Sequence, residues 1–123
     1  MSLLQIAEPG MSTAPHQERF AVGIDLGTTN SLAATVRNGS PEVLVDENNQ
    51  KLLPSVVHYQ KDGGVVVGEE ARLRAEADPL NTISSVKRFM GRSASELQNS
   101  RYMPYDFIKG EGMVKLNTSQ GAK

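Results

Sequence analysis

One short stretch, residues 22–31, combines a carboxylate, a glycine and several hydroxyl groups. Asp25 follows an apolar run, and Gly27 permits a tight turn because it carries no Cβ. Consecutive amides around such a turn can converge on an anion, and the hydroxyls of Thr28 and Thr29 can donate to phosphate oxygens. Asp25 could hold magnesium, which prefers oxygen ligands. The stretch therefore predicts a triphosphate and magnesium site; the alternative is a structural β-turn that only satisfies local amides.

The sequence on either side of this turn predicts two strands. Residues 20–24 form a short apolar run. Residues 31–37 alternate roughly in polarity and end at Asn38-Gly39, the strongest short hairpin signal. The familiar glycine-loop phosphate sites lead instead from a strand into a helix. We therefore expect the phosphate on the bend of a β-hairpin, bound by amides and hydroxyls without a helix dipole.

A second glycine-rich segment, residues 63–68, has the spacing of a Walker loop as far as its last glycine. Glu69 and Glu70 then stand where that loop requires Lys followed by Ser or Thr. Two carboxylates would repel the phosphate that the lysine attracts. We predict a plain turn at Asp62-Gly63-Gly64.

Three cations lie close together within residues 86–92. The apolar residues around them repeat at three- and four-residue spacing, which predicts a helix that begins at Asn81 or Thr82 and runs through Met90. Cations at a helix C-terminus complement its dipole and are usually solvated. The alternative is that one lysine reaches a phosphate or orients the attacking water during γ-phosphate transfer.

Length and composition bound the architecture. The 123 residues suffice for one domain with a core, but not for two complete lobes. The formal net charge of −1 and the 5% of aromatic residues suggest neither nucleic acid nor an anionic membrane as a partner. The sequence contains no cysteine, which excludes disulfides and thiol catalysis in this segment. Residues 1–18 lack apolar periodicity and a cationic leader, so we expect a flexible arm, no secretion, and a fold in residues 19–123.

Strand and helix patterns are interleaved along the remaining chain, which indicates an α/β fold. A third strand at 42–46, followed by a polar turn at 47–50, completes an opening β-meander. The further expected strands cover 56–59, 65–67, 105–109 and 113–117, and the further helices cover 69–77 and, after a capping box at Ser93 to Glu96, 93–99.

Three segments in register resemble the start of the seventy-kilodalton heat-shock chaperones, the DnaK-like family. They are residues 23–31, Leu53-Pro54-Ser55, and residues 81–83 with 86–92. The resemblance runs from about Phe20 to at least Asn117. The N-terminal arm is similar to the HscA branch, the bacterial chaperones dedicated to iron-sulfur cluster assembly, in Leu3-Leu4-Gln5-Ile6, Glu8-Pro9-Gly10 and Ala14-Pro15-His16-Gln17.

Sugar kinases and bacterial actins share the Asp-x-Gly-Thr hairpin and are the natural alternatives. Sugar kinases commonly carry an arginine shortly after the threonines, where this chain has Asn30-Ser31-Leu32. Neither group combines the later Leu-Pro-Ser and Lys-Arg-x-x-Gly-Arg segments. The chaperone resemblance accounts for more of the sequence. A piece of a general protein-folding chaperone or sugar kinase, and a non-catalytic actin-like interaction module, remain the alternative interpretations.

The resemblance implies an actin-like ATPase fold, in which two lobes with ribonuclease H-like sheets clamp a nucleotide. This chain would supply the opening β-meander of the first lobe and much of its peripheral α/β subdomain. The implied cofactors are ATP or ADP with magnesium. By resemblance, Gly27, Thr28, Thr29 and Asn30 form the first phosphate loop, and Asp25 positions magnesium through water.

The resemblance also implies catalytic residues and partners. Lys87 would contact the phosphate region and assist hydrolysis, and Thr29 is a second candidate for handling the γ-phosphate. The implied partners are a J-domain cochaperone and a scaffold protein that carries a nascent iron-sulfur cluster, in the bacterial cytoplasm. The second phosphate loop, the adenosine-binding segment and the peptide-binding domain of that family are missing. We therefore expect half of an active site, with little or no ATPase activity by itself.

Overall fold

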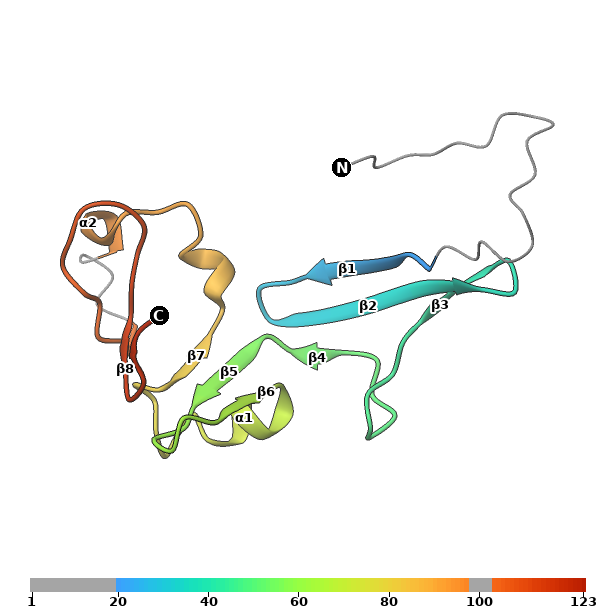
Figure 1. The fold of residues 1–123 in the computed structure, drawn as a ribbon, viewed down its shortest axis with the longest axis horizontal. Helices are drawn as coiled ribbons and strands as arrows, with labels where there is room; N and C mark the ends of the chain where they lie inside the picture. Colours follow the sequence, from blue (N-terminus) through green and yellow to red (C-terminus); the bar gives the residue numbers. More distant parts are fainter. Residues whose placement is uncertain (1–19, 98–102) are drawn as a thin grey trace.

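The structure is a computed structural model that describes residues 20–97 and 103–123. The arm expected at 1–18 and the expected end of the last helix near Asn99 lie outside the described residues. A long, narrow sheet occupies one side of the molecule and a more compact lobe the other (Figure 1). The α/β expectation is confirmed only in its coarse form, because the described elements are mostly strands and the helices are few and short.

The long sheet is built around its second strand. Its strands are β1 (Val22–Leu26), β2 (Asn30–Arg37), β3 (Ser40–Val43) and β4 (Leu53–Pro54). All pairings are antiparallel, in the order β1-β2-β3, and β4 pairs with the start of β2. β1 is consequently an edge strand among the described residues. The two predicted strands around the first turn are confirmed, with boundaries shifted by one or two residues.

The turn from β2 to β3 has the predicted two-residue form. Asn38 and Gly39 adopt φ angles of 51° and 75°, in the left-handed region that these residue types tolerate, and Arg37 pairs directly with Ser40. The prediction of a third strand at 42–46 is wrong in its boundaries. Because the turn has only two residues, β3 begins at Ser40, and it ends at Val43 instead of at residue 46.

The polar turn predicted at 47–50 is confirmed. The Oδ1 atom of Asp46 accepts hydrogen bonds of 2.8 Å from the backbone N–H groups of both Asn48 and Gln50. Asn49 has a φ of 59°. A short carboxylate side chain thus replaces the missing backbone partners at this point.

The lobe begins with a second sheet and a short helix. Its strands are β5 (Val56–Tyr59), β6 (Val65–Val67) and β7 (Thr82–Ser84), in the order β6-β5-β7, and helix α1 covers Glu69–Leu73. The plain turn predicted at 62–64 is confirmed, because the Gly64 N–H donates to Asp62 Oδ1 at 2.9 Å. The helix predicted over 69–77 is shorter than expected. Only Ala71 of α1 is buried, so no apolar stripe extends it.

The helix predicted from Asn81 or Thr82 through Met90 is wrong. Residues 82–84 form β7, which pairs with β5, and η1 (Val86–Arg88) is a single 3₁₀ turn. Ser85, between them, has a left-handed φ of 55°, which no helix interior permits. Ile83 is 3% exposed, so its burial in a strand overrides the helical spacing. The dipole argument for the cations therefore fails with the helix.

The end of the chain adds α2 (Ala94–Leu97), β8 (Asn117–Thr118) and β9 (Gly121–Ala122). The capping box is confirmed in its Glu96 half, since Glu96 Oε2 accepts the Ser93 N–H at 2.8 Å. The strands predicted at 105–109 and 113–117 are wrong. Phe107 and Leu116 form a single bridge, and Met113 pairs with Ser93 instead, so no continuous ladder can form between the two segments.

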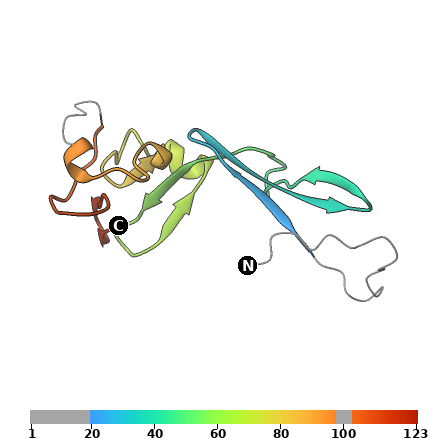
Figure 2. The same ribbon diagram turned by 90° about the horizontal axis from the view of Figure 1, so that it is seen from above.

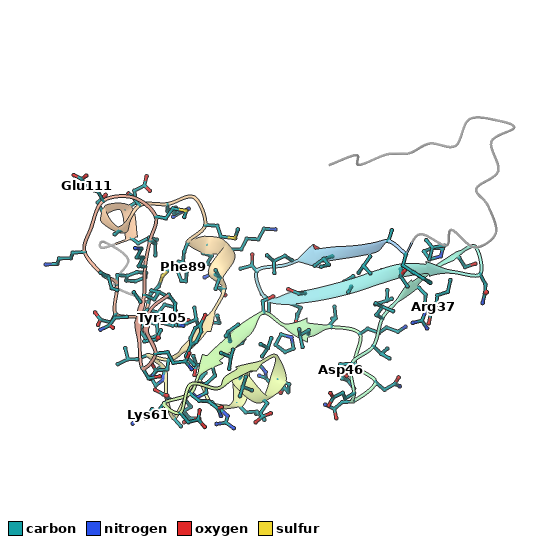
Figure 3. The ribbon with its side chains drawn as sticks, viewed as in Figure 1. Arg37, Asp46, Lys61, Phe89, Tyr105 and Glu111 are labelled. Atoms are coloured by element: carbon teal, nitrogen blue, oxygen red, sulfur yellow. The ribbon has the colours of Figure 1, made fainter. Side chains whose placement is uncertain are left out.

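The hydrophobic core lies in the lobe. Its buried members are Ile83, Phe89, Leu97 and Leu116. The rings of Tyr105 and Phe107 meet Phe89 edge to face, with centroids 5.7 and 5.9 Å away, and Figure 3 shows the Phe89 and Tyr105 side chains on the inner side of the lobe. None of the helices in residues 20–97 and 103–123 is long and apolar enough to cross a membrane.

Candidate functional site

The turn between β1 and β2 points at the lobe in both views of the ribbon (Figures 1 and 2). Gly27 is required there for steric reasons. A Cβ built on Gly27 would overlap the backbone carbonyl oxygen of Asn30. Any other residue would have to displace the backbone across the turn. The shape of this bend therefore requires glycine at position 27.

Ser55 joins the turn to the start of the lobe. Its backbone N–H donates to Thr29 O at 2.9 Å, and its hydroxyl donates to Gly27 O at 2.8 Å. The hydroxyl oxygens of Ser31 and Ser55 are also 2.8 Å apart. The turn is thus held from one side by a single half-buried serine, which follows directly on β4.

Lys87 reaches the same turn from the lobe. Its Nζ donates to the carbonyl oxygen of Leu26 at 3.1 Å, across 61 positions in the sequence. The left-handed Ser85 directs the chain into η1, and Ser84 before it donates its backbone N–H to the Tyr105 hydroxyl at 3.0 Å. A cation thus lies beside Leu26, the last residue of β1 before the turn, and it comes from a 3₁₀ turn instead of the expected helix end.

Several donors of the turn have no partner within residues 20–97 and 103–123. Neither the backbone N–H nor the hydroxyl of Thr28 or Thr29 makes a hydrogen bond there. Asp25 is exposed and forms no ion pair within 4.0 Å among these residues, including with Lys87. The structure therefore brings Lys87 to the turn that Thr28 and Thr29 occupy, and leaves Asp25 one residue before the lysine contact.

A cleft of about 530 Å³ opens between the turn and the lobe. It is lined by Thr28, Thr29, Asn30, Pro54, Ser55, Val56, Glu69, Arg72, Ser84 and Ser85. Arg72 Nε donates to Glu69 Oε2 at 2.8 Å. This hydrogen bond, with the attraction between the charges, lowers the pKa of Glu69 and raises that of Arg72. The paired charges of α1 therefore largely cancel at the edge of the cleft.

These residues fit a phosphate group. Unpaired amides and hydroxyls at Thr28 and Thr29 are donors that an anion satisfies, and the Lys87 ammonium adds a charge. The described residues contain no cluster of three or more histidine, cysteine or acidic side chains suited to a metal ion. Magnesium beside Asp25 would therefore take most of its oxygen ligands from water and phosphate, as it commonly does.

Sequence reasoning missed the residues that hold the site together. Ser55 lies in the Leu53-Pro54-Ser55 segment, which contributes to the family resemblance but has no chemical role apparent from its sequence. Arg72 and Tyr105 gave no signal at all. A serine after a proline, or a tyrosine 21 positions beyond its hydrogen-bond partner Ser84, is recognisable only once the strands are paired.

Comparisons with known proteins identify similar sequences. The family model described as "Hsp70 protein" matches residues 21–123. The chain is 61% identical to the "Chaperone protein HscA homolog" of Herminiimonas arsenicoxydans and 62% identical to that of Janthinobacterium sp. (strain Marseille). It is 58% identical to the homolog of Burkholderia ambifaria. Each alignment covers 100% of this chain and 20% of the relative, so the chain spans about a fifth of their length.

Proposed function

Because this chain belongs to the Hsp70 family, we propose that it is part of the ATPase domain of a molecular chaperone that assists iron-sulfur cluster assembly. In the proposed function, ATP binding and hydrolysis control the binding of a client protein. The name HscA homolog of the aligned relatives supports the assignment to iron-sulfur cluster assembly. The match to the Hsp70 model over residues 21–123 favours this interpretation over a sugar kinase.

In the proposed domain, the long sheet is the opening β-meander of the first lobe of an actin-like ATPase. In the same proposal, the compact lobe is much of its peripheral α/β subdomain. In this proposal, residues 19–123 are the N-terminal part of the ATPase domain and residues 1–18 precede it. The second half of the nucleotide site belongs to the part of the domain that this chain does not contain, so we expect the chain alone to turn over little or no ATP.

The observation that carries the proposal is the contact of Lys87 with the first turn. A lysine ammonium is strongly hydrated and sits on a flexible side chain. Here it donates a hydrogen bond of 3.1 Å to Leu26 O, 61 positions away in the sequence. Thr28 and Thr29 follow Leu26 by two and three positions, and their amides and hydroxyls are unpaired within the described part of the chain. A cation beside free donors is the arrangement that stabilises negative charge on a transferring phosphoryl group.

The proposed roles follow from this placement. The amides and hydroxyls of residues 27–30 bind phosphate oxygens and fix their position. Lys87 neutralises charge that develops on the phosphate or orients the attacking water, and the Thr29 hydroxyl is a second group able to do so. Asp25 holds magnesium through water. When bound, magnesium supplies screening of the phosphate charges.

The proposed function includes two protein partners and a cellular compartment. We expect a J-domain cochaperone to stimulate hydrolysis and a scaffold protein carrying an iron-sulfur cluster to be the client. We expect the protein to act in the bacterial cytoplasm, with no nucleic acid or membrane as a partner. This chain contains no cysteine to serve as a cluster ligand.

The test compares variants of a full-length protein that carries this segment. Lys87→Ala should lower the rate of ATP turnover roughly 100-fold, the usual effect of removing one transition-state donor. Asp25→Asn should raise the magnesium concentration needed for half-maximal turnover. Lys61→Ala removes a lysine from the remote turn after β5 and should leave turnover unchanged (Figure 3).

Unchanged turnover in both Lys87→Ala and Asp25→Asn would contradict the proposed function. That outcome would favour a non-catalytic actin-like interaction module, in which the first turn only shapes a hairpin. The exposed apolar side chains of β1, Val22, Ile24 and Leu26, are the observation in favour of such a module.

A further inference from the structure

We infer that Ser55 is a positioning residue for phosphate binding, which fixes the orientation of the turn between β1 and β2 without touching the nucleotide. This inference rests on the proposed function. It concerns a residue for which the sequence predicted no role, and which makes more contacts to the turn than Lys87 does.

The single hydroxyl proton of Ser55 fixes the direction of its two side-chain hydrogen bonds. Ser55 has one hydroxyl proton, and its hydroxyl donates to Gly27 O at 2.8 Å. The contact of 2.8 Å between the Ser31 and Ser55 hydroxyls must then be donated by Ser31. With its backbone N–H on Thr29 O, Ser55 uses two donors and one acceptor on a single short turn. Alanine would keep only the backbone bond.

These bonds fix two peptide planes of the turn. The carbonyl oxygens of Gly27 and Thr29 both point at Ser55. The described residues have no cis peptide bond, and in a trans peptide the N–H of the next residue points opposite to the carbonyl. The N–H groups of Thr28 and Asn30 therefore face away from Ser55. Ser55 thus determines on which side the turn presents these two donors.

The local structure explains why this position can act as a brace. β4 pairs Leu53 with Ser31 and Pro54 with Asn30, which brings the next residue, Ser55, level with Thr29. Directly after it, Val56 is buried and begins β5. Ser55 is consequently the residue that links β4 of the long sheet to β5 of the lobe, and it also contacts the turn.

The lobe end of this link is also fixed. The Gly68 N–H, just before α1, donates to Val56 O at 2.9 Å. Gly68 is buried with a φ of 86°, and a side chain there would press on Leu53. The residue that follows Ser55 is therefore fixed as well, which a positioning residue requires if its own rotamer is to define the geometry of the site.

The experiment uses a full-length protein that carries this segment, with calorimetric titration of ADP and, separately, adenosine. Ser55→Ala removes both hydroxyl hydrogen bonds and should weaken ADP binding about tenfold, since each bond makes a modest net contribution. Adenosine has no phosphate, so its affinity should not change. Ser55→Thr retains the hydroxyl and should restore most of the ADP affinity. Ser40→Ala, on the exposed strand β3, is the matched control and should change neither affinity.

Each result decides the inference. Equal weakening of ADP and adenosine by Ser55→Ala would show a general structural role and overturn it, as would unchanged ADP affinity. If Ser55→Ala does not fold, Ser55→Cys replaces it, because a thiol keeps the volume but donates weakly. The proposed function is judged separately: Lys87→Ala and Asp25→Asn test it, and their loss of turnover with an unaffected Ser55→Ala would refute only the role of Ser55.

Discussion

The long sheet and the compact lobe differ in what stabilises them. The buried hydrophobic side chains of the described residues all lie at or beyond Val56. In the sheet, residues 20–55, every residue of β1 is exposed, and Ile24 is 74% exposed. The sheet is therefore held by its hydrogen-bond ladders and two polar turns, whereas the lobe also buries apolar area, which is the dominant favourable term in folding.

The candidate site is held in place by residues of the lobe and its border. The first turn belongs to the sheet, which has no core of its own among the described residues, but the groups that fix it come from the lobe or its border. Ser55 donates to two carbonyls of the turn and Lys87 to a third, at Leu26. The proposed phosphate-binding turn lies on a hairpin without a core among the described residues, and it is held by the part of the chain that has one.

The largest expected effect contrasts one apolar side chain from each region. Phe89 is 6% exposed and packs on two aromatic rings, so Phe89→Ala should lower the free energy of unfolding by about 3–5 kcal/mol. Ile24→Ala, on the exposed β1, should lower it by less than about 0.5 kcal/mol. Urea unfolding of the 123-residue chain, followed by circular dichroism, measures both.

Equal losses of unfolding free energy in Phe89→Ala and Ile24→Ala would contradict this difference between the two regions, because they would mean that β1 is covered in solution. The concentration dependence of unfolding would then show whether a second copy of the chain provides the cover.

The next effect tests the turn itself. Gly27→Ala places a Cβ against the Asn30 carbonyl, so the turn must shift, at a cost of about 1–3 kcal/mol. The matched control is Gly23→Ala in β1, the strand that precedes the turn, where the nearest atom, Ala34 O, would be 3.8 Å away. That variant should be neutral or slightly stabilising, because alanine restricts the unfolded chain. A stability difference of less than a few tenths of a kcal/mol between the two variants would contradict the steric role of Gly27.

A smaller effect concerns the lobe side of the site. Tyr105→Phe keeps the edge-to-face contact with Phe89 but removes the hydroxyl that accepts the Ser84 N–H at 3.0 Å. We expect a loss of about 1 kcal/mol in unfolding free energy. A double-mutant cycle with Ser84→Ala separates the backbone bond from the hydroxyl contact of 3.1 Å between the two side chains. Full additivity would mean that the side-chain contact contributes nothing.

The smallest effect is a pH dependence at the cleft. Hydrogen bonding to Arg72 lowers the pKa of Glu69 below its ordinary value of 4.5. The contribution of the pair to stability is therefore present above pH 4.5 and is lost as the pH falls through the lowered pKa of the folded state. Both side chains are exposed to solvent, so the change should be slight. NMR titration of the Glu69 carboxyl in the chain and in Arg72→Ala measures it; identical pKa values would contradict the pairing.

The same contrast explains how far the sequence predicts the structure. In the sheet, alternation of polarity and the Asn38-Gly39 turn act over a few residues, so the β1–β2–β3 order follows from local rules. In the lobe, the spacing of Ile83, Val86 and Phe89 favours a helix, but burial against β5 selects a strand and a 3₁₀ turn. Local pattern cannot reveal that choice, because the deciding partner lies about 25 residues earlier in the chain.

The candidate site divides in the same way. The types of residue in the first turn indicate phosphate chemistry from the sequence alone, and that role remains a prediction. The contact of Lys87 with Leu26 and the brace at Ser55 depend on long-range pairing of β4 and β7. A sequence pattern can thus identify donors, but it cannot show which of them a distant residue will fix in place.

The sequence separation of these contacts has a kinetic consequence. The β1–β2 hairpin closes over a few residues and can form in about 1–10 μs, whereas the Ser55 and Lys87 contacts join positions 28 and 61 residues apart. Long closures cost more chain entropy and come later in folding. The turn should consequently exist as a loose bend before it becomes a binding surface. Hydrogen exchange should reach the Thr28 and Thr29 amides, which make no hydrogen bond within the described residues, before the paired amides of β2.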